Sequence, residues 1–407
     1  MPYKTKILLW SSTAVFMAAI LAGGCEPAKV TKKYYYTYTD DNILLALRRY
    51  RSANPSPDKD PVILCHGLSY NLLFWDLRDD VSLAMYLARA GYDVWSLSLR
   101  GAAPSSQPLN SSIRKLVHFN LDPESLLTIQ KRIRDLKMLD WSVDDHIRYD
   151  VPAAIKFVQS QTQHKHVHWI GHSMGGMIMF SYLEQHPSEE ESGIKSFVAA
   201  GVPMAMFHPL SEPMEFLQDI QLALKVGSHI VGSSAPATWG VIFGNINTPR
   251  NKLLYNNENM DGGVLRDLFR RAEEEISPSE LKQFLKLVQT ERFQSLDGSI
   301  DYTAGLSQVK TPTYFMVGTL DNMATVGAVR YSYRQVASGQ KQFGLFGRVN
   351  SYRADYGHND IFVGKHAREE VYPTILDWLQ LFTVDNTKME DKLLLQPAKT
   401  EPDQKTK

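Results

Sequence analysis

The chain has 407 residues, 43% of them apolar and 22% charged, which is enough to bury a large core in one big domain or two smaller ones. Its 44 basic and 44 acidic residues balance, so the composition argues against a nucleic-acid partner. The only cysteines are Cys25 and Cys65, so we predict neither a disulfide framework nor a metal site.

The N-terminus has the layout of a secretory signal peptide. Lys4 and Lys6 precede an uncharged, mainly apolar stretch from Ile7 to Ala22, and small residues lead to Cys25. The stretch is shorter than the roughly 20 residues of a membrane-spanning helix. It also resembles a bacterial lipoprotein signal, which implies that Cys25 is lipidated and begins the mature chain. We therefore predict a signal peptide over 1–25 and an exported protein in a bacterial cell envelope; an uncleaved N-terminal membrane anchor is the alternative.

Apolar runs then alternate with helical patterns. Aromatic residues from Lys33 to Tyr38, a turn at Asp40, and Ile43 to Tyr50 predict a β-hairpin. Further strands are predicted at Val62–Cys65, Asp93–Leu97, Val167–Ile170, Phe197–Ala200, Thr313–Val317 and, more weakly, near Arg348–Tyr352. Helices are predicted at Val81–Ala90, Ser142–Gln161, Met174–His186 and Glu369–Phe382. This alternation predicts a mostly parallel sheet with helices on both faces.

The helix predicted at Ser142–Gln161 contains its own start signal and an interruption. It opens with Ser142 and Asp145 in a capping-box pattern. Pro152 lies inside it, so we expect a kink there or a restart with Asp150 as the N-cap.

Two stretches interrupt the alternation. Residues 102–141 carry a polar loop and a helical pattern, and residues 205–305 are longer, mostly helical in pattern and rich in Met, Leu and Phe. Because the second stretch separates two core strands, we expect a helical cap over one end of the sheet. The expected domains are a core at 26–204, the cap at 205–305, the rest of the core at 306–385 and a disordered tail at 386–407.

The most informative motif is G-x-S-x-G at Gly171-His172-Ser173-Met174-Gly175, between an apolar strand and a helix. A nucleophile on such a sharp turn stands clear of the backbone, and small residues two positions away let strand and helix pass closely. In this context the motif predicts a nucleophilic serine, whereas in isolation it would describe a glycine-rich turn with an idle serine.

Several motifs together resemble the α/β-hydrolase superfamily, and within it the acid-lipase-like and monoacylglycerol-lipase-like serine esterases. They are Cys65-His66-Gly67-Leu68, Gly91-Tyr92-Asp93-Val94-Trp95, Arg100-Gly101, Tyr149-Asp150-Val151-Pro152-Ala153, the segment around Ser173, and Gly357-His358-Asn359-Asp360. The resemblance covers nearly all of residues 33–384, with residues 102–141 and the cap as departures. It implies an α/β-hydrolase fold with a helical cap insertion.

A serine hydroxyl needs a base to take its proton, and this fold presents its triad in the order Ser, acid, His. His358 lies in a loop before the last helix, where the resemblance puts the catalytic base; His172 and His366 are the alternatives we set aside. Asp321 follows the buried strand at Thr313–Val317 and is the predicted acid. We expect Asp355 and Asp360 to cap helices or loops.

The developing oxyanion requires two backbone N–H groups. We expect them from Met174, which follows the serine, and from Leu68, with His66 shaping the loop. The resulting acyl transfer needs no metal or organic cofactor.

The favoured function is hydrolysis of a carboxylic ester with an apolar acyl part. An acyltransferase with the same triad is the first alternative, and a lipid-binding lipoprotein that keeps the fold without turnover is the second. The sequence leaves the oligomeric state open.

Overall fold

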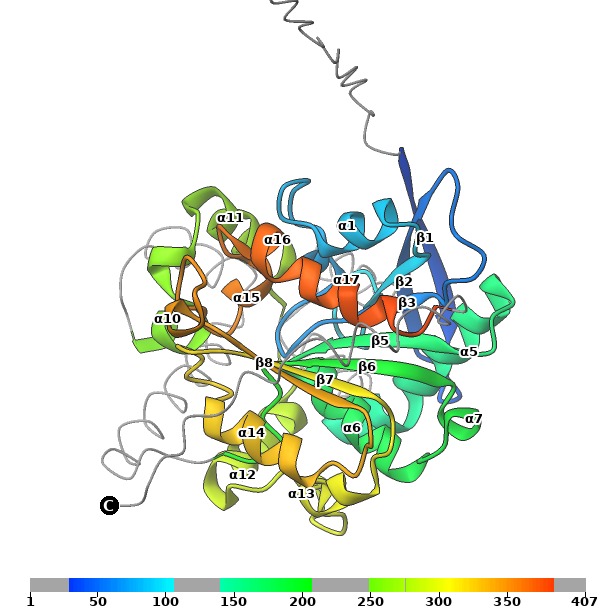
Figure 1. The fold of residues 1–407 in the computed structure, drawn as a ribbon. Coiled ribbons are helices and arrows are strands. Elements are labelled where there is room, and N and C mark those ends of the chain that lie inside the picture. Colours follow the sequence, from blue (N-terminus) through cyan, green and yellow to red (C-terminus); the bar gives the residue numbers. More distant parts are fainter. Residues whose placement is uncertain (1–28, 106–139, 207–248, 275, 384–407) are drawn as a thin grey trace, which may run out of the picture.

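The computed structural model describes residues 29–105, 140–206, 249–274 and 276–383 (Figure 1). The predicted signal peptide at 1–25, most of the stretch at 102–141, residues 207–248 of the stretch at 205–305 and the tail from residue 384 lie outside the described residues. Within the described ranges, no helix is both long enough and apolar enough to cross a membrane.

An eight-stranded sheet forms the centre, in the order β1-β2-β4-β3-β5-β6-β7-β8. The strands are β1 (Val30–Tyr38), β2 (Leu44–Ser52), β3 (Val62–Cys65), β4 (Val94–Ser98), β5 (Val167–His172), β6 (Ile194–Ala200), β7 (Thr313–Gly318) and β8 (Lys341–Phe346). β2 is antiparallel to β1 and to β4, and every other pairing is parallel. The mostly parallel sheet that the alternation predicted is confirmed.

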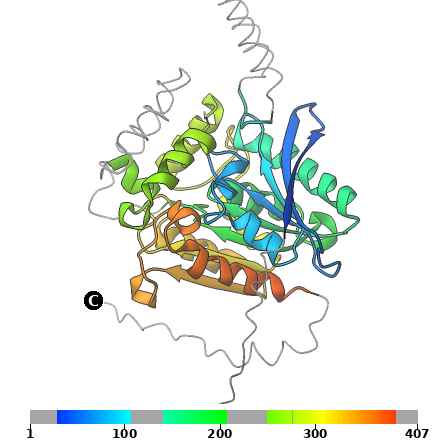
Figure 2. The ribbon, with the colours of Figure 1, turned by 90° about the horizontal axis from the view of Figure 1, so that it is seen from above.

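Helices cover both faces of the sheet (Figures 1 and 2). They include α1 (Leu83–Arg89), α5 (Val151–Thr162), α6 (Met174–Gln185), α7 (Glu189–Ser192), α14 (Val326–Gln335), α15 (Asp360–Val363), α16 (Ala367–Glu370) and α17 (Tyr372–Gln380). One core packs α5, α6 and α14 against the sheet, and the other packs α1, α15 and α17 against its opposite face. β3, β5 and β7 are buried along their whole length, which explains why they read as apolar runs.

The predicted last strand near Arg348–Tyr352 is wrong. β8 lies earlier, at Lys341–Phe346, and Arg348–Asn350 form a 3-10 turn. β8 is the outer strand of the sheet and is mostly only half-buried, so its sequence, with Lys341 and Gln342 at the start, carries little apolar signal.

The predicted helix at Ser142–Gln161 is divided. α4 (Val143–Asp145) leads into a π-helical turn, His146–Asp150, and then α5. The capping box is confirmed, because the Asp145 carboxylate accepts the Ser142 N–H at 2.8 Å. Asp150 is not a capping side chain: it has helical backbone angles, φ −73° and ψ −45°, and its carboxylate bonds elsewhere. The carboxylate binds the buried side chains of Arg100 and His146 at the same time.

The described part of the second insertion, from residue 249, is helical as predicted. It contains α10 (Pro249–Leu254), α11 (Gly262–Asp267), a π-helical turn at Leu268–Ala272, α12 (Pro278–Thr290) and α13 (Tyr302–Gly305). In Figure 1, α10 and α11 lie beside α15 and α16.

Candidate active site

Ser173 occupies a strained turn between β5 and α6. Its backbone angles, φ 52° and ψ −121°, are ones that residues other than glycine rarely adopt. A Cβ atom at Gly171 would lie 2.4 Å from the Gly175 oxygen, and one at Gly175 would lie 2.4 Å from the Cys65 oxygen. The spacing of the motif is therefore set by backbone that passes too closely for any side chain.

Asp321 and His358 form a buried hydrogen-bonded pair. The imidazole Nδ1 lies 3.0 and 2.9 Å from the two carboxylate oxygens of Asp321, and both residues are 4% exposed. Asp321 follows β7, and its Oδ1 also accepts the backbone N–H of Met323 and Ala324. The loops of the pair are joined directly, because Leu320 N–H donates to the Tyr356 oxygen at 2.8 Å.

The serine turn lies against this pair. The His172 ring Nε2 lies 2.9 Å from the backbone oxygen of His358, and the two rings are 4.6 Å apart. A Cβ atom at Gly201, after β6, would lie 3.0 Å from Asp321 and 3.2 Å from His358. Among the described residues, no hydrogen bond joins the Ser173 hydroxyl to His358; such bonds often tighten only when substrate binds.

The loop after β3 lies on the other side of the serine. A Cβ atom at Gly67 would be 3.0 Å from the Ser173 Cβ. Met174 is the first residue of α6, so its N–H has no acceptor within the helix. Neither this N–H nor that of Leu68 donates to another described residue.

His66 holds that loop as a neutral imidazole. Its Nε2 accepts the Leu99 N–H at 3.2 Å, so its Nδ1 donates to the Gly67 oxygen at 2.9 Å. Burial lowers the pKa of His66 to about 4, which keeps it uncharged at neutral pH. The side chain is a structural support for the loop.

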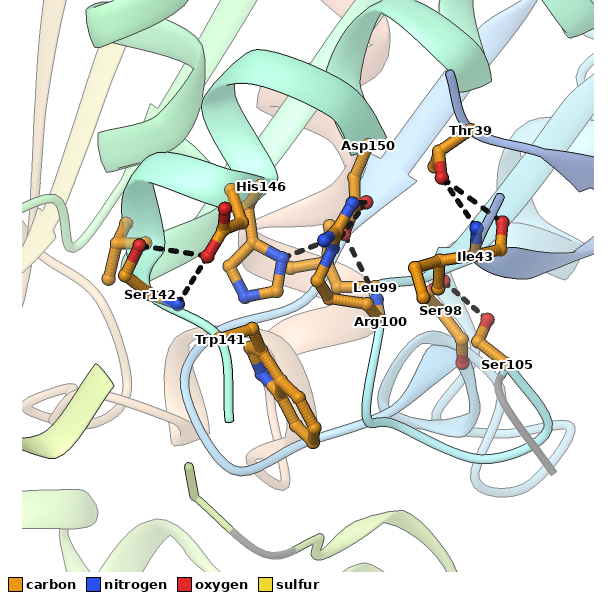
Figure 3. Close-up of polar contacts among 12 residues, drawn as sticks. Thr39, Ile43, Ser98, Leu99, Arg100, Ser105, Trp141, Ser142, His146 and Asp150 are labelled. Carbon is orange, nitrogen blue, oxygen red and sulfur yellow. Dashed lines mark hydrogen bonds and ion pairs between the residues drawn. The ribbon is translucent and has the colours of Figure 1, made fainter. Parts of the chain in front are cut away.

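A chain of alternating charges is buried beside the site, and Figure 3 shows its central members His146, Asp150 and Arg100. The His146 ring bridges Asp150 and Glu280, each at 2.7 Å, and Asp150 binds the Arg100 guanidinium at 2.9 Å. Arg100 continues to Asp41 at the hairpin turn, at 2.7 Å. Burial opposes the charge on His146, but hydrogen bonds to the two carboxylates raise its pKa to about 9. The chain links α12 of the insertion to the core and to the hairpin, and the sequence offered no signal for it beyond the Arg100-Gly101 and Tyr149-Asp150 motifs.

The insertion also holds the loops beside Ser173. Glu274 N–H donates to the Ser69 oxygen at 2.8 Å, and Asn71 N–H donates to Ala272 at 2.9 Å. On the other side, Asn359 N–H donates to the Leu254 oxygen at 2.8 Å. One insertion thus contacts both loops. The sequence predicted a cap here but not these contacts.

A small hollow, partly open to solvent and with room for about one water molecule, lies beside Met174. Its lining is mixed, with the polar side chains of His66, Arg100, Glu274 and Glu280 beside apolar ones such as Leu99 and Trp141. Within the described residues, no group of three or more His, Cys, Asp or Glu side chains is arranged to hold a metal ion. As expected, Asp355 and Asp360 accept hydrogen bonds from backbone N–H groups of nearby loops. Asp355 accepts the Arg348 N–H and Asp360 the Gly357 N–H, each at 2.9 Å.

Known proteins match this chain in sequence and in fold. Residues 60–225 match the family model described as the alpha/beta hydrolase fold. Gastric triacylglycerol lipase of Rattus norvegicus is 30% identical over 186 residues, 44% of this chain and 42% of the relative. Human lysosomal acid lipase/cholesteryl ester hydrolase is 31% identical over 185 residues, 44% of this chain and 41% of the relative. These matches thus span less than half the length of either lipase.

A longer match and two solved structures extend the likeness. Triacylglycerol lipase 1 of Arabidopsis thaliana is 24% identical over 379 residues, 87% of this chain and 88% of the relative. A bacterial membrane phospholipase A superposes with a TM-score of 0.52 at 15% identity, with 86% of each chain covered. An esterase from Thermogutta terrifontis has the same TM-score and identity, with 88% of this chain and 100% of that chain covered. The chain therefore has the α/β-hydrolase fold and is related in sequence to lipases.

Proposed function

We propose that the chain is a serine hydrolase that cleaves carboxylic esters through an acyl-enzyme on Ser173. His358 takes the serine proton as Ser173 attacks the carbonyl, and Asp321 orients the imidazole and stabilises its charged form. The N–H groups of Leu68 and Met174 bind the oxyanion. His358 then protonates the departing alcohol, and water activated by the same histidine releases the acid.

The observation that carries this proposal is that the Asp321–His358 pair and the Ser173 turn lie at the same place in the fold. The buried Asp321–His358 pair, with Nδ1 and Oδ2 2.9 Å apart, lies at the same edge of the sheet as the strained Ser173 turn. Two backbone N–H groups without a partner among the described residues flank that turn. This shared location, at the edge where α/β sheets bind their ligands, supports the roles proposed for Ser173, His358 and Asp321.

The substrate we propose is an ester with an apolar acyl part. The names of the sequence relatives, gastric triacylglycerol lipase among them, support a lipid ester. The hollow beside Met174 has room for about one water molecule, so it suits the attacking water better than an acyl chain.

The test is hydrolysis of p-nitrophenyl esters from acetate to palmitate by the full-length chain in detergent, beside Ser173→Ala. We expect activity that falls by about a million-fold in the variant. Ser181→Ala is the matched control, because Ser181 is a buried serine of the same helix, away from the turn. If folded protein neither hydrolyses any ester nor reacts with a fluorophosphonate, the lipid-binding alternative replaces this proposal. Acyl products formed with added glycerol would identify an acyltransferase.

We also propose export to a bacterial cell envelope and lipidation of Cys25. The support is the pattern of residues 1–25: a basic start, an apolar stretch and small residues before the cysteine. Metabolic labelling with palmitate should mark the wild type and not Cys25→Ser. Membrane-bound protein without label would favour an uncleaved N-terminal anchor.

A further inference from the structure

Asp360, two residues after His358, is a buried carboxylate that accepts three N–H groups. Its Oδ1 accepts the backbone N–H of Gly357 at 2.9 Å and that of Asn256 at 3.0 Å, and its Oδ2 accepts the side-chain amide of Asn259 at 2.8 Å. Asn256 and Asn259 belong to the insertion at 205–305, 104 and 101 residues earlier in the chain. One side chain therefore joins the loop of the proposed base to the insertion.

The insertion packs closely around the peptide units on both sides of His358. A Cβ atom at Gly357 would lie 2.7 Å from the Asp360 carboxylate and 2.8 Å from the Asn256 nitrogen, so the backbone leaves no room for a side chain there. On the other side of the base, the N–H of Asn359 donates to a backbone oxygen of the insertion at 2.8 Å. One neighbour of His358 is thus bound to the insertion directly, and the other is bound to it through Asp360.

The charge of the carboxylate depends on the same contacts. Burial raises the pKa of Asp360 to about 6, while hydrogen bonds from Asn256, Asn259 and Gly357 favour the ionised form. A buried charge needs hydrogen bonds in place of the water that it has lost. Because two of the three donors come from the insertion, the insertion stabilises the charged carboxylate, and the carboxylate in turn binds the insertion.

We propose that Asp360 is a positioning residue for the catalytic base: by accepting N–H groups from the His358 loop and from the insertion together, it sets the place of the His358 imidazole relative to Ser173. This inference rests on the proposed function and adds a residue that touches neither the substrate nor the reacting atoms. The role requires an acceptor of the right shape. The Asn259 amide oxygen has no partner among the described residues, so a rotated Asn259 amide can accept a hydrogen bond from an asparagine at position 360.

The test compares Asp360→Ala, Asp360→Asn and Asp144→Ala in the full-length chain in detergent. Asp144 is the matched control, because its carboxylate also accepts hydrogen bonds from three residues of the insertion, at 2.8, 2.8 and 3.0 Å, but lies outside the loops of the triad. Hydrolysis of p-nitrophenyl butyrate at pH 8, where Asp360 is ionised, gives kcat and KM, and unfolding in urea gives stability.

For Asp360→Ala we expect a loss on the order of a hundred-fold in kcat with KM changed by less than about twofold, because a displaced base slows the chemical step. Asp360→Asn should keep kcat within about threefold of the wild type, because its amide retains the three contacts. Asp144→Ala should lose stability and keep its kcat. If Asp360→Ala does not fold, Asn259→Ala, which removes a single donor, should lower kcat about tenfold in folded protein.

Proton NMR reports the position of the base without turnover. The Nδ1 proton that His358 shares with Asp321 gives a downfield signal, which is assigned by its absence in His358→Gln. We expect this signal in the wild type, Asp360→Asn and Asp144→Ala, and its loss in Asp360→Ala.

Three results would overturn the proposal. They are a downfield signal or kcat in Asp360→Ala equal to that of the wild type, equal losses of kcat in Asp360→Ala and Asp144→Ala, and an Asp360→Asn variant as slow as Asp360→Ala. A wild type that shows the downfield signal but hydrolyses no ester would instead contradict the proposed function, and the signal in the variants would still test the role of Asp360.

Discussion

The side-chain amide of Asn359 donates a 2.8 Å hydrogen bond to the phenol oxygen of Tyr70, across 289 residues of sequence. Asn359 follows His358 directly, and Tyr70 ends the loop that carries Leu68. The bond therefore joins the loop of the proposed base to the loop of the proposed oxyanion donor. Both residues are buried, which makes the loss of either polar partner costly.

Tyr70→Phe should lower both stability and turnover. The Asn359 amide would lose this acceptor, and its Oδ1 already has no partner among the described residues. We expect a loss of about 1–3 kcal/mol in the free energy of unfolding, measured in urea, and roughly tenfold in kcat with little change in KM. Tyr36→Phe, at an exposed position, should change neither quantity. Unchanged kcat in Tyr70→Phe would show that the two loops keep their positions without the bond.

Gly201→Ala should disturb the acid–base pair. Gly201 has a φ of +58°, and an added Cβ would meet both Asp321 and His358 within about 3.2 Å. We expect at least a tenfold loss of kcat, and destabilisation of about 1–2 kcal/mol from the backbone conformation alone. At Gly339 a Cβ meets no atom within 4 Å, so Gly339→Ala should be neutral in both assays. Similar activities for the two variants would contradict the close packing.

The strain at Ser173 predicts a difference between two inactive variants. Ser173→Ala keeps a Cβ at φ 52° and ψ −121°, whereas Ser173→Gly removes it. Glycine adopts such angles readily, so we expect Ser173→Gly to be more stable than Ser173→Ala by about 1–3 kcal/mol. Thermal or urea unfolding of the purified variants measures the difference. The reverse order would mean that the turn is relaxed in solution.

His146 should make the fold sensitive to alkaline pH. Its pKa in the fold, about 9, lies above its ordinary value of 6.5, so folding favours the protonated ring. Its contribution is complete below about pH 6.5 and is lost as the pH rises through about 9. Unfolding in urea from pH 6 to pH 10 should show stability falling by a few kcal/mol, on the order of 1.4 kcal/mol per unit of pKa shift.

His146→Gln provides the comparison, because glutamine keeps hydrogen-bonding capacity without a titrating charge. The free energy of unfolding of this variant should not fall between about pH 6.5 and 9, because glutamine has no proton to lose beside Asp150 and Glu280. Parallel pH profiles for the two proteins would show that His146 is not charged in the fold.

The elements that could be predicted from the sequence are those whose signal is local. β3 and β7 are buried throughout, so their apolar runs were sufficient to predict them as strands. The hairpin of β1 and β2 was predicted from its aromatic residues and its turn. β8 was misplaced because an outer strand buries too little to impose a pattern. α5 does restart after Asp150, one of the two outcomes expected from Pro152, but the Asp150 carboxylate does not cap it, because it binds Arg100, 50 residues away, and His146.

For the candidate site, the sequence by itself determined the nucleophile turn at Ser173, since strand, glycines and helix are contiguous, and it nominated Asp321 and His358 by order and resemblance. Tertiary structure alone decided what surrounds them. The pairing of His146 with Glu280 spans 134 residues, and that of Tyr70 with Asn359 spans 289. Buried polar groups must find partners wherever the folded chain brings them, so such contacts follow spatial proximity and leave no periodic trace in the sequence.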